Sequence, residues 1–168
     1  MWNNIILIGF MGSGKTNIGR RLAKKLGYVL LDTDSLIEAN YGINICDFFK
    51  RFGEGAFREV EVDLCKWLEI NTKNAIISTG GGMPTIYDVR NLGYVIYLDT
   101  PFAEIKKRVL NDGTNNRPMI KDIESLHALY QERLPIYQNA AHYSIGTLDS
   151  KESIVDNIYH HLKGIKEL

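Results

Sequence analysis

The sequence contains little cysteine and no long apolar run. Its two cysteines, Cys46 and Cys65, have no C-x-x-C spacing, which excludes a disulfide scaffold and a paired-cysteine metal motif. No apolar run approaches the length needed to cross a bilayer. Residues 1–4 lead directly into the first predicted strand, without the features of a signal peptide. We therefore expect free, partly buried thiols and a cytoplasmic location.

The chain also lacks an excess of either charge. Lys and Arg together number 20, as do Asp and Glu, so no general attraction to nucleic acid or anionic membranes is expected. The four histidines do not have metal-ligand spacing with cysteines or carboxylates, which favours surface or packing roles for them. With 168 residues the chain is long enough for one domain with a substantial core, and its neutral surface favours a monomer.

The most informative stretch is residues 9–16, Gly-Phe-Met-Gly-Ser-Gly-Lys-Thr, which fits the phosphate-loop pattern G-x-x-x-x-G-K-[ST]. A β-branched apolar run at residues 5–8 precedes it, and helical spacing follows as far as Gly27. A strand, a glycine-rich loop and a helix N-terminus together form an anion site. Lys15 is expected to hold the β- and γ-phosphates of a nucleotide, and the Thr16 hydroxyl is expected to bind Mg²⁺.

A second strand, residues 28–34, ends in two carboxylates, Asp32 and Asp34. Ligands of open parallel sheets lie beyond the carboxyl ends of strands, and residues two apart on an extended chain point to the same side. This places a carboxylate pair beside the phosphate loop, where a metal and an acceptor hydroxyl need partners. The alternative is a structural role, because Asp34 or Ser35 could cap the following helix, at residues 36–39.

Arg58 and Glu61 lie three residues apart on a predicted helix, residues 54–68, and are therefore neighbours on its surface. One interpretation is a surface ion pair that contributes little, and the pattern alone favours it. The other is an arginine held by Glu61 beside Phe49 and Phe57, in position to bind an anion.

The remaining pattern predicts further strands and helices. Residues 74–79 form a third strand, and the three glycines at 80–82 let backbone amides approach a ligand. Residues 111–118 are polar and resemble a lid that carries Arg117. The other expected helices are residues 42–53 (ended by Gly53), 87–92, 102–110, 126–134 and 154–165, and the other strands are 94–98 and 143–147.

In order and spacing these motifs resemble those of shikimate kinases over essentially the whole chain. They are residues 9–16, Asp32-x-Asp34, Phe57-Arg58-x-x-Glu61, residues 80–82, Arg117-Pro118 and Arg133-x-Pro135-x-Tyr137. The resemblance implies an α/β P-loop kinase fold like that of nucleoside-monophosphate kinases, with a five-stranded parallel sheet flanked by helices on both faces. It also implies ATP-dependent phosphorylation of the 3-hydroxyl of shikimate, with Mg²⁺, in aromatic amino-acid biosynthesis. Residues 1–168 would form one domain, with a substrate-binding region at about 33–61 and a lid at about 111–123.

The resemblance also assigns roles residue by residue. Asp34 would orient the acceptor hydroxyl and take its proton, with Lys15 and Arg117 as the other catalytic groups. Thr16 and Asp32 would hold the metal, while Arg108 would lie against adenine. The implied nucleotide-binding residues are Gly12, Ser13, Gly14, Lys15, Thr16, Arg108 and Arg117, and the implied shikimate-binding residues are Asp34, Phe49, Phe57, Arg58, Glu61, Gly80, Gly81 and Arg133.

Two positions depart from the family pattern, and two other functions stay open. Met83-Pro84 stands where small residues are usual and is expected to stiffen the loop, and His142 stands where an Asp is common. The rival functions are another small-metabolite kinase, for gluconate or a nucleotide, and a P-loop module that uses ATP as a switch. The switch would need no acceptor site.

Overall fold

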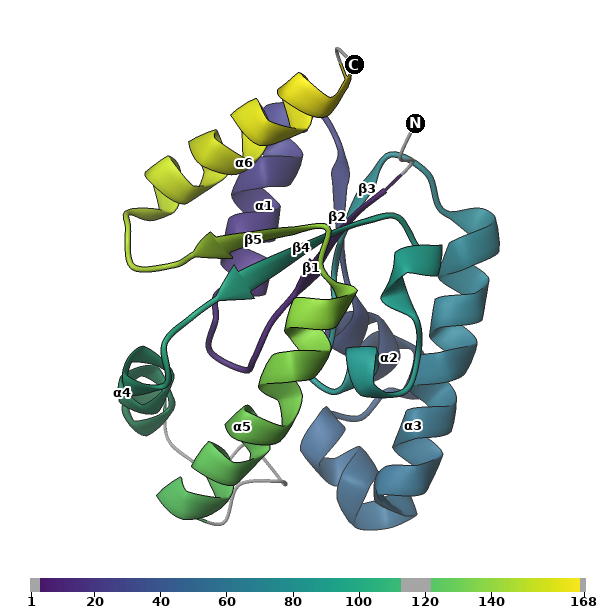
Figure 1. Ribbon diagram of the computed structural model, residues 1–168. Coiled ribbons are helices and arrows are strands. Elements are labelled where there is room, and N and C mark those ends of the chain that lie inside the picture. The colour runs from purple at the N-terminus through teal and green to yellow at the C-terminus, as the bar shows by residue number, and fades with distance from the viewer. Residues whose placement is uncertain (1–3, 113–121, 167–168) are drawn as a thin grey trace.

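Five parallel strands form the centre of the fold (Figure 1). The computed structural model describes residues 4–112 and 122–166. The strands lie in the order β2-β3-β1-β4-β5, and every neighbouring pair is parallel. Their bounds are β1 Ile5–Ile8, β2 Val29–Asp32, β3 Ala75–Ser78, β4 Tyr94–Asp99 and β5 Tyr143–Gly146.

Helices cover both faces of this sheet, as predicted (Figure 1). Helices α1 and α6 pack on one face, and α3, α4 and α5 pack on the other. None of the helices in the described ranges is long and apolar enough to cross a membrane. The helix bounds are α1 Lys15–Leu26, α2 Thr33–Tyr41, α3 Ile45–Asn71, α4 Phe102–Asp112, α5 Ile123–Ala140 and α6 Lys151–Lys166.

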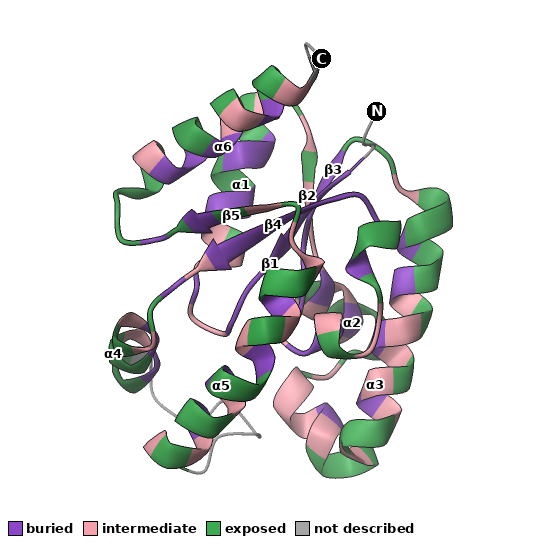
Figure 2. Cartoon of the chain, in the orientation of Figure 1, coloured by how far each residue is buried: buried purple, intermediate pink, exposed green. Residues whose placement is uncertain are grey.

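Burial follows the sequence pattern of each element (Figure 2). Strands β1, β3 and β4 are buried almost throughout, because helices cover them on both sides, whereas β2 lies at an edge and is partly exposed. Helix α1 approaches the sheet closely at Gly19, where a Cβ would lie 2.8 Å from the Cδ1 of Leu30. Gly27 ends α1 in the left-handed conformation, as predicted.

The boundary between β2 and α2 differs from the prediction. The strand ends at Asp32 instead of Asp34, and Asp34 lies in the first turn of α2. The predicted cap, Asp34 or Ser35, is also wrong. Asp32 is the N-cap, and its carboxylate accepts a hydrogen bond from the Ser35 N–H at 3.1 Å. An extended residue with a carboxylate side chain favours this position, and the helix therefore starts at Thr33, three residues before the expected Leu36.

Two helix predictions also need correction. The helix expected at residues 87–92 is only a 3₁₀ turn, Val89–Asn91, because the Asp88 carboxylate accepts from the Arg90 N–H and Gly93 then leaves the helical region. Helix α5 does not end before Pro135 but continues to Ala140, since Tyr137 beyond the proline is buried in the core. The glycine stop at Gly53 is confirmed as a break inside α3, with φ 80° and ψ 174°.

The two positions that depart from the family pattern have structural partners. Met83 is fully buried and starts a 3₁₀ turn, Met83–Thr85, in which the Thr85 hydroxyl donates to the Gly82 carbonyl. The His142 N–H donates to the Val95 carbonyl, and the Val95 N–H donates to His142 Nδ1 at 3.0 Å. His142 therefore extends the pairing between β4 and β5. Cys46 and Cys65 are free thiols, as predicted.

Candidate active site

A cavity of about 570 Å³ opens at the carboxyl edge of the sheet, where β1, β2 and β3 end. It brings together residues that lie far apart in the sequence. Of the predicted site residues, the cavity is lined by Gly12, Gly14, Lys15, Thr16, Asp32, Asp34, Phe49, Phe57, Arg58, Glu61, Gly80, Gly81 and Arg133. Ser13 and Arg108 lie beside it, in or against the phosphate loop. Arg117 and the central part of the predicted lid lie outside the described residues.

The phosphate loop has a backbone that only glycine adopts easily. Gly9, Gly12 and Gly14 have φ values of 149°, 77° and 91°. Lys15 Nζ donates to the carbonyl oxygens of Gly9 and Phe10 at 2.8 and 3.1 Å, so the ammonium lies over the loop. The hydroxyl oxygen of Ser13 is buried without a hydrogen-bond partner among the described residues. A loop at a helix N-terminus with a lysine over it and an unsatisfied polar group within it fits a phosphate chain.

Arg108 connects helix α4 to this loop. Its Nη1 donates to the Gly12 carbonyl at 2.8 Å, and its Nε donates to Glu104 at 2.9 Å. The side chain is about one third exposed, so one face of the guanidinium remains open beside the loop. A planar cation in this position can stack on an aromatic base.

The start of α1 and the end of β2 supply oxygen ligands for a metal. Thr16 Oγ1 donates to Asp32 Oδ2 at 2.6 Å, and the Ser78 hydroxyl lies 3.4 Å from Thr16 Oγ1. No group of three or more His, Cys, Asp or Glu side chains in the described ranges could hold a metal by itself.

Asp34 lies in a half-buried position on the first turn of α2, facing the cavity. Burial raises the pKa of its carboxyl above the ordinary value, and the negative charges of Asp32 and Glu38 raise it further, while Lys15 opposes them. A carboxylate whose pKa moves toward neutrality accepts a proton more readily.

Arg58 and Glu61 form an ion pair that belongs to the cavity wall. Arg58 Nη1 lies 2.5 Å from Glu61 Oε2, and the Glu61 side chain is only 1% exposed. Burial raises the pKa of Glu61, which its pairing with Arg58 only partly offsets. The interpretation as an exposed surface pair is therefore wrong. Arg58 Nη2 lies 3.0 Å from Glu54 Oε1, so the guanidinium is fixed from two sides.

The three glycines at 80–82, here called the glycine strip, leave room that side chains would fill. A Cβ at Gly82 would lie 2.3 Å from Arg58 Nη1, and a Cβ at Gly81 would lie 3.5 Å from Arg133 Nη1. The strip therefore lets both arginines approach the cavity floor. Arg133 is 5% exposed, lies over the Phe10 ring, and has no carboxylate partner within the described part of the chain. Phe49 and Phe57, with ring centroids 4.7 Å apart, add an apolar wall.

Ser78, Glu38 and Tyr137 belong to this region but had no predicted role. Ser78 pairs in register with Asp32 at the ends of their strands, so the rule for carboxyl ends could have found it. Glu38 follows Asp34 by one helical turn and lines the cavity, where its carboxylate accepts from the Ile45 N–H. Tyr137 is buried behind the cavity, and no local pattern indicated its contacts.

Comparison with known proteins agrees with this geometry. The family model described as "SKI: Shikimate kinase" matches residues 11–163. A shikimate kinase from Helicobacter hepaticus is 50% identical over 142 residues, which is 84% of this chain and 85% of that protein. The chain belongs to the shikimate kinase family.

Solved structures place this shikimate kinase family member among P-loop kinases. The structure of shikimate kinase from Acinetobacter baumannii in complex with shikimate superposes with a TM-score of 0.87 at 33% identity, covering 98% of this chain and 94% of that one. A deoxyadenosine kinase from M. mycoides, at 17% identity and a TM-score of 0.67, covers 96% of this chain and 99% of that one and shares only the fold. The chain is thus an enzyme that phosphorylates shikimate with ATP in aromatic biosynthesis.

Proposed function

We propose that this enzyme transfers the γ-phosphoryl group of ATP to the 3-hydroxyl of shikimate, with Asp34 as the general base. The observation that carries this proposal is the position of Asp34, whose carboxyl has a raised pKa, in the same cavity as the phosphate loop and the two arginines. Asp34 orients the attacking hydroxyl and receives its proton as the bond to phosphorus forms. A base of this kind contributes about 10²–10⁴-fold to the rate.

Lys15, Thr16 and Asp32 act on the phosphate side of the reaction. Lys15 turns from its loop carbonyls toward the β- and γ-phosphates, and the amides of residues 12–14 hold the same chain. Thr16 and Asp32, already 2.6 Å apart, hold Mg²⁺, which supplies positive charge to the transferring oxygens when bound. Arg108 stacks on the adenine, and Arg117 closes over the phosphates from a lid at about residues 111–123.

Arg58 and Arg133 act on the substrate side. Their guanidinium groups reach neighbouring glycines of the strip, so one small ligand can contact both. An anionic group between them is best met by a carboxylate, because planar guanidinium and carboxylate groups form paired hydrogen bonds. Glu61 holds Arg58 in place, Gly80 and Gly81 contact the ring substituents, and Phe49 and Phe57 pack against the ring.

The remaining expectations from the sequence become part of this proposal. Residues 1–168 act as one domain, with the substrate region at about 33–61. The enzyme works as a monomer in the cytoplasm, without nucleic-acid or membrane partners. The balanced charge of the chain supports a monomer without nucleic-acid or membrane partners.

A single assay tests the proposal. ADP release is measured with shikimate, quinate, gluconate, AMP or no acceptor, in the presence of Mg²⁺. We expect release to depend on shikimate, with small rates for the other compounds. Equal rates with gluconate or AMP would favour another metabolite kinase. ADP release that no acceptor stimulates would favour a P-loop switch, in which Asp34, Arg58 and Arg133 could change without loss of function.

A further inference from the structure

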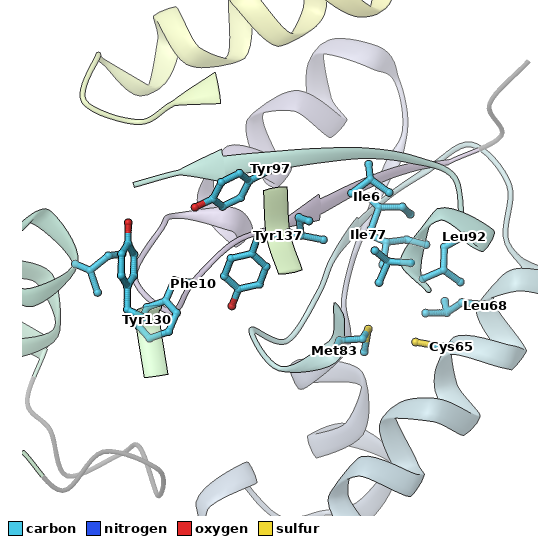
Figure 3. Packing of buried hydrophobic residues seen from close by; sticks show 14 of the residues in the cluster. Ile6, Phe10, Cys65, Leu68, Ile77, Met83, Leu92, Tyr97, Tyr130 and Tyr137 are labelled. Carbon is cyan, nitrogen blue, oxygen red and sulfur yellow. The ribbon is translucent and has the colours of Figure 1, made fainter. Parts of the chain in front are cut away.

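The hydroxyl of Tyr137 reaches the backbone of the glycine strip from outside the cavity. It donates a hydrogen bond to the Gly81 carbonyl at 2.6 Å, and the residue is 1% exposed. Its ring packs near that of Tyr97 in the buried cluster (Figure 3). Tyr137 does not line the cavity, whereas Gly81 does. Any effect of Tyr137 on the substrate must therefore pass through the groups that it contacts.

Helix α5 presents Tyr137 and Arg133 to the same glycine. The two residues are four apart, so their side chains lie on one face of the helix, one turn from each other. Arg133 Nη1 lies 3.5 Å from the position of a Cβ on Gly81. Burial raises the pKa of Tyr137 to about 12 despite the nearby Arg133 charge, so its hydroxyl remains a donor at neutral pH.

The carbonyls of the strip are held in a fixed orientation. The Gly80 carbonyl accepts from the Met83 N–H at 3.1 Å, and the Gly81 carbonyl accepts from Tyr137. In a trans peptide the C=O and the following N–H point in opposite directions. The bond from Tyr137 therefore also fixes the direction of the Gly82 N–H, at a residue that lines the cavity.

We propose that Tyr137 is a positioning residue for shikimate: its hydroxyl holds the Gly81–Gly82 peptide in the orientation that binds the substrate beside Arg133. The proposal rests on the function proposed above, because it acts through Gly81 and Arg133. Without the hydroxyl, the peptide of Gly81 and Gly82 can rotate, and the Gly81 carbonyl loses this partner. Substrate binding must then also order the glycine strip. This cost weakens the binding of the ground state and of the transition state equally.

A matched pair of variants tests this. Tyr130 lies on the same helix, is also buried, and donates its hydroxyl to a backbone carbonyl, that of Thr100, at 3.1 Å. Tyr137→Phe and Tyr130→Phe each remove one such bond and keep the ring, and Tyr137→Phe also removes the hydrogen bond between the tyrosine hydroxyl and Arg133. We expect Tyr137→Phe to raise KM and Kd for shikimate about 2- to 12-fold, the range for the loss of one hydrogen bond. Its kcat and its KM for ATP should stay within about twofold, as should all constants of Tyr130→Phe.

Amide hydrogen exchange separates positioning from general destabilisation. Exchange at the Met83 N–H, which donates to the Gly80 carbonyl across the Gly81–Gly82 peptide, should accelerate in Tyr137→Phe and not in Tyr130→Phe, even if both lower Tm by similar amounts. Equal shikimate KM values for the two variants, or an unchanged Met83 exchange rate, would overturn the proposal. If instead the wild-type protein shows no shikimate-dependent ADP release, the proposed function fails, and the exchange experiment still reports on the contact.

Discussion

Asp34 and Glu61 point carboxylate oxygens at the same side of Gly80. A Cβ built on Gly80 would lie 2.8 Å from Asp34 Oδ1 and 2.8 Å from Glu61 Oε1. The proposed base and the partner of Arg58 can both approach this position only because residue 80 has no side chain. Burial raises the pKa of both carboxyls, and the negative charge of Asp34 raises the pKa of Glu61 further. Gly80 therefore lies where the proposed base, Asp34, meets the Arg58–Glu61 pair of the proposed anion site.

Gly80→Ala should reduce activity because the added methyl displaces one of these carboxylates. A shift of about 1 Å in a reacting group can cost about 10²-fold, and we expect a loss of that order in kcat/KM. The control is Gly164→Ala on α6, where no atom lies within 4 Å of the added methyl. That variant should keep full activity and gain about 0.4–1 kcal/mol in stability by urea unfolding. Wild-type kcat/KM in Gly80→Ala would contradict this account of the site.

Asp34→Asn should lower kcat about 10²–10⁴-fold while shikimate and ATP still bind, because the base acts only as the proton leaves. In the wild type, kcat/KM should fall as the pH drops through the Asp34 pKa, at a pH above the 3.8 of an ordinary aspartate, since the base must be ionised. The residual activity of Asp34→Asn should lack this acidic limb. If Asp34→Asn kept the acidic fall in activity, that fall would be due to the titration of another group.

Asp32→Asn should instead change the response to Mg²⁺. The side chain accepts from the Thr16 hydroxyl and from the Ser35 N–H through different oxygens. An asparagine keeps the bond from Ser35 with its amide oxygen and can donate from its amide nitrogen to Thr16 Oγ1, while it loses the negative charge. We expect a higher Mg²⁺ concentration for half-maximal activity, with little change in kcat at saturation. Titrating Mg²⁺ for both aspartate variants makes the comparison, and identical titrations would show that the proposed division of roles is wrong.

Arg133→Lys should be costly although it keeps the charge. Loss of one hydrogen bond to a charged group costs about 1.5–3 kcal/mol, or roughly 10- to 150-fold in kcat/KM. The loss should appear mainly as a raised KM for shikimate, because the proposed carboxylate lies away from the reacting hydroxyl. The methyl ester of shikimate is the control substrate. It should be poor for the wild type, and Arg133→Lys should discriminate less between acid and ester.

His142 should make the fold less stable at mildly acidic pH. Burial lowers its pKa below the ordinary 6.5, Arg90 lowers it further, and Asp88 opposes this. Its Nδ1 accepts the Val95 N–H, so protonation removes that acceptor. As the pH falls, His142 binds a proton in the unfolded chain before it does so in the folded chain. Its contribution to the free energy of unfolding is therefore present above about pH 6.5 and is lost as the pH falls through the His142 pKa of the folded state. His161, with a pKa also lowered by burial, contributes with the same sign.

Urea unfolding at pH 7.5 and pH 5.5 measures this effect. The free energy of unfolding should fall on acidification in the wild type and fall less in His142→Asn. His160→Asn, on an exposed position of α6, should keep the wild-type slope. A steeper slope in His142→Asn would mean that the histidine stabilises the fold in its charged form.

The order of strands and helices and the phosphate loop could be predicted because each rests on a local pattern. Helices separate the successive strands, except between β3 and β4, where only 3₁₀ turns lie, and the apolar runs of the strands are visible in the sequence. Asp34 was expected as the last residue of a strand, at the carboxyl edge of the sheet. It does lie at this edge, but on helix α2 and not on a strand, because Asp32 ends the strand and caps that helix.

Properties that depend on packing between distant segments could not be predicted. The burial of Glu61 results from helix α3 lying against the glycine strip, which nothing in the helical pattern indicates. In the same way, Pro135 indicated a helix end, whereas the burial of Tyr137 against β4 stabilises the helix beyond it. The hydrogen bond of Tyr137 could not be predicted either, because its partner, Gly81, lies 56 residues earlier in the chain.

The continuous course of α5 through Pro135 limits how the length of this chain can vary. Tyr130, Arg133 and Tyr137 reach their three partners from one unbroken helix. Each residue inserted into a helix rotates everything after it by about 100°. One residue inserted between Tyr130 and Arg133 would turn the arginine out of the cavity and the second tyrosine away from its glycine, while an insertion before Ile123 would leave all three in phase. Tolerance to insertions should therefore drop abruptly at the first turn of this helix.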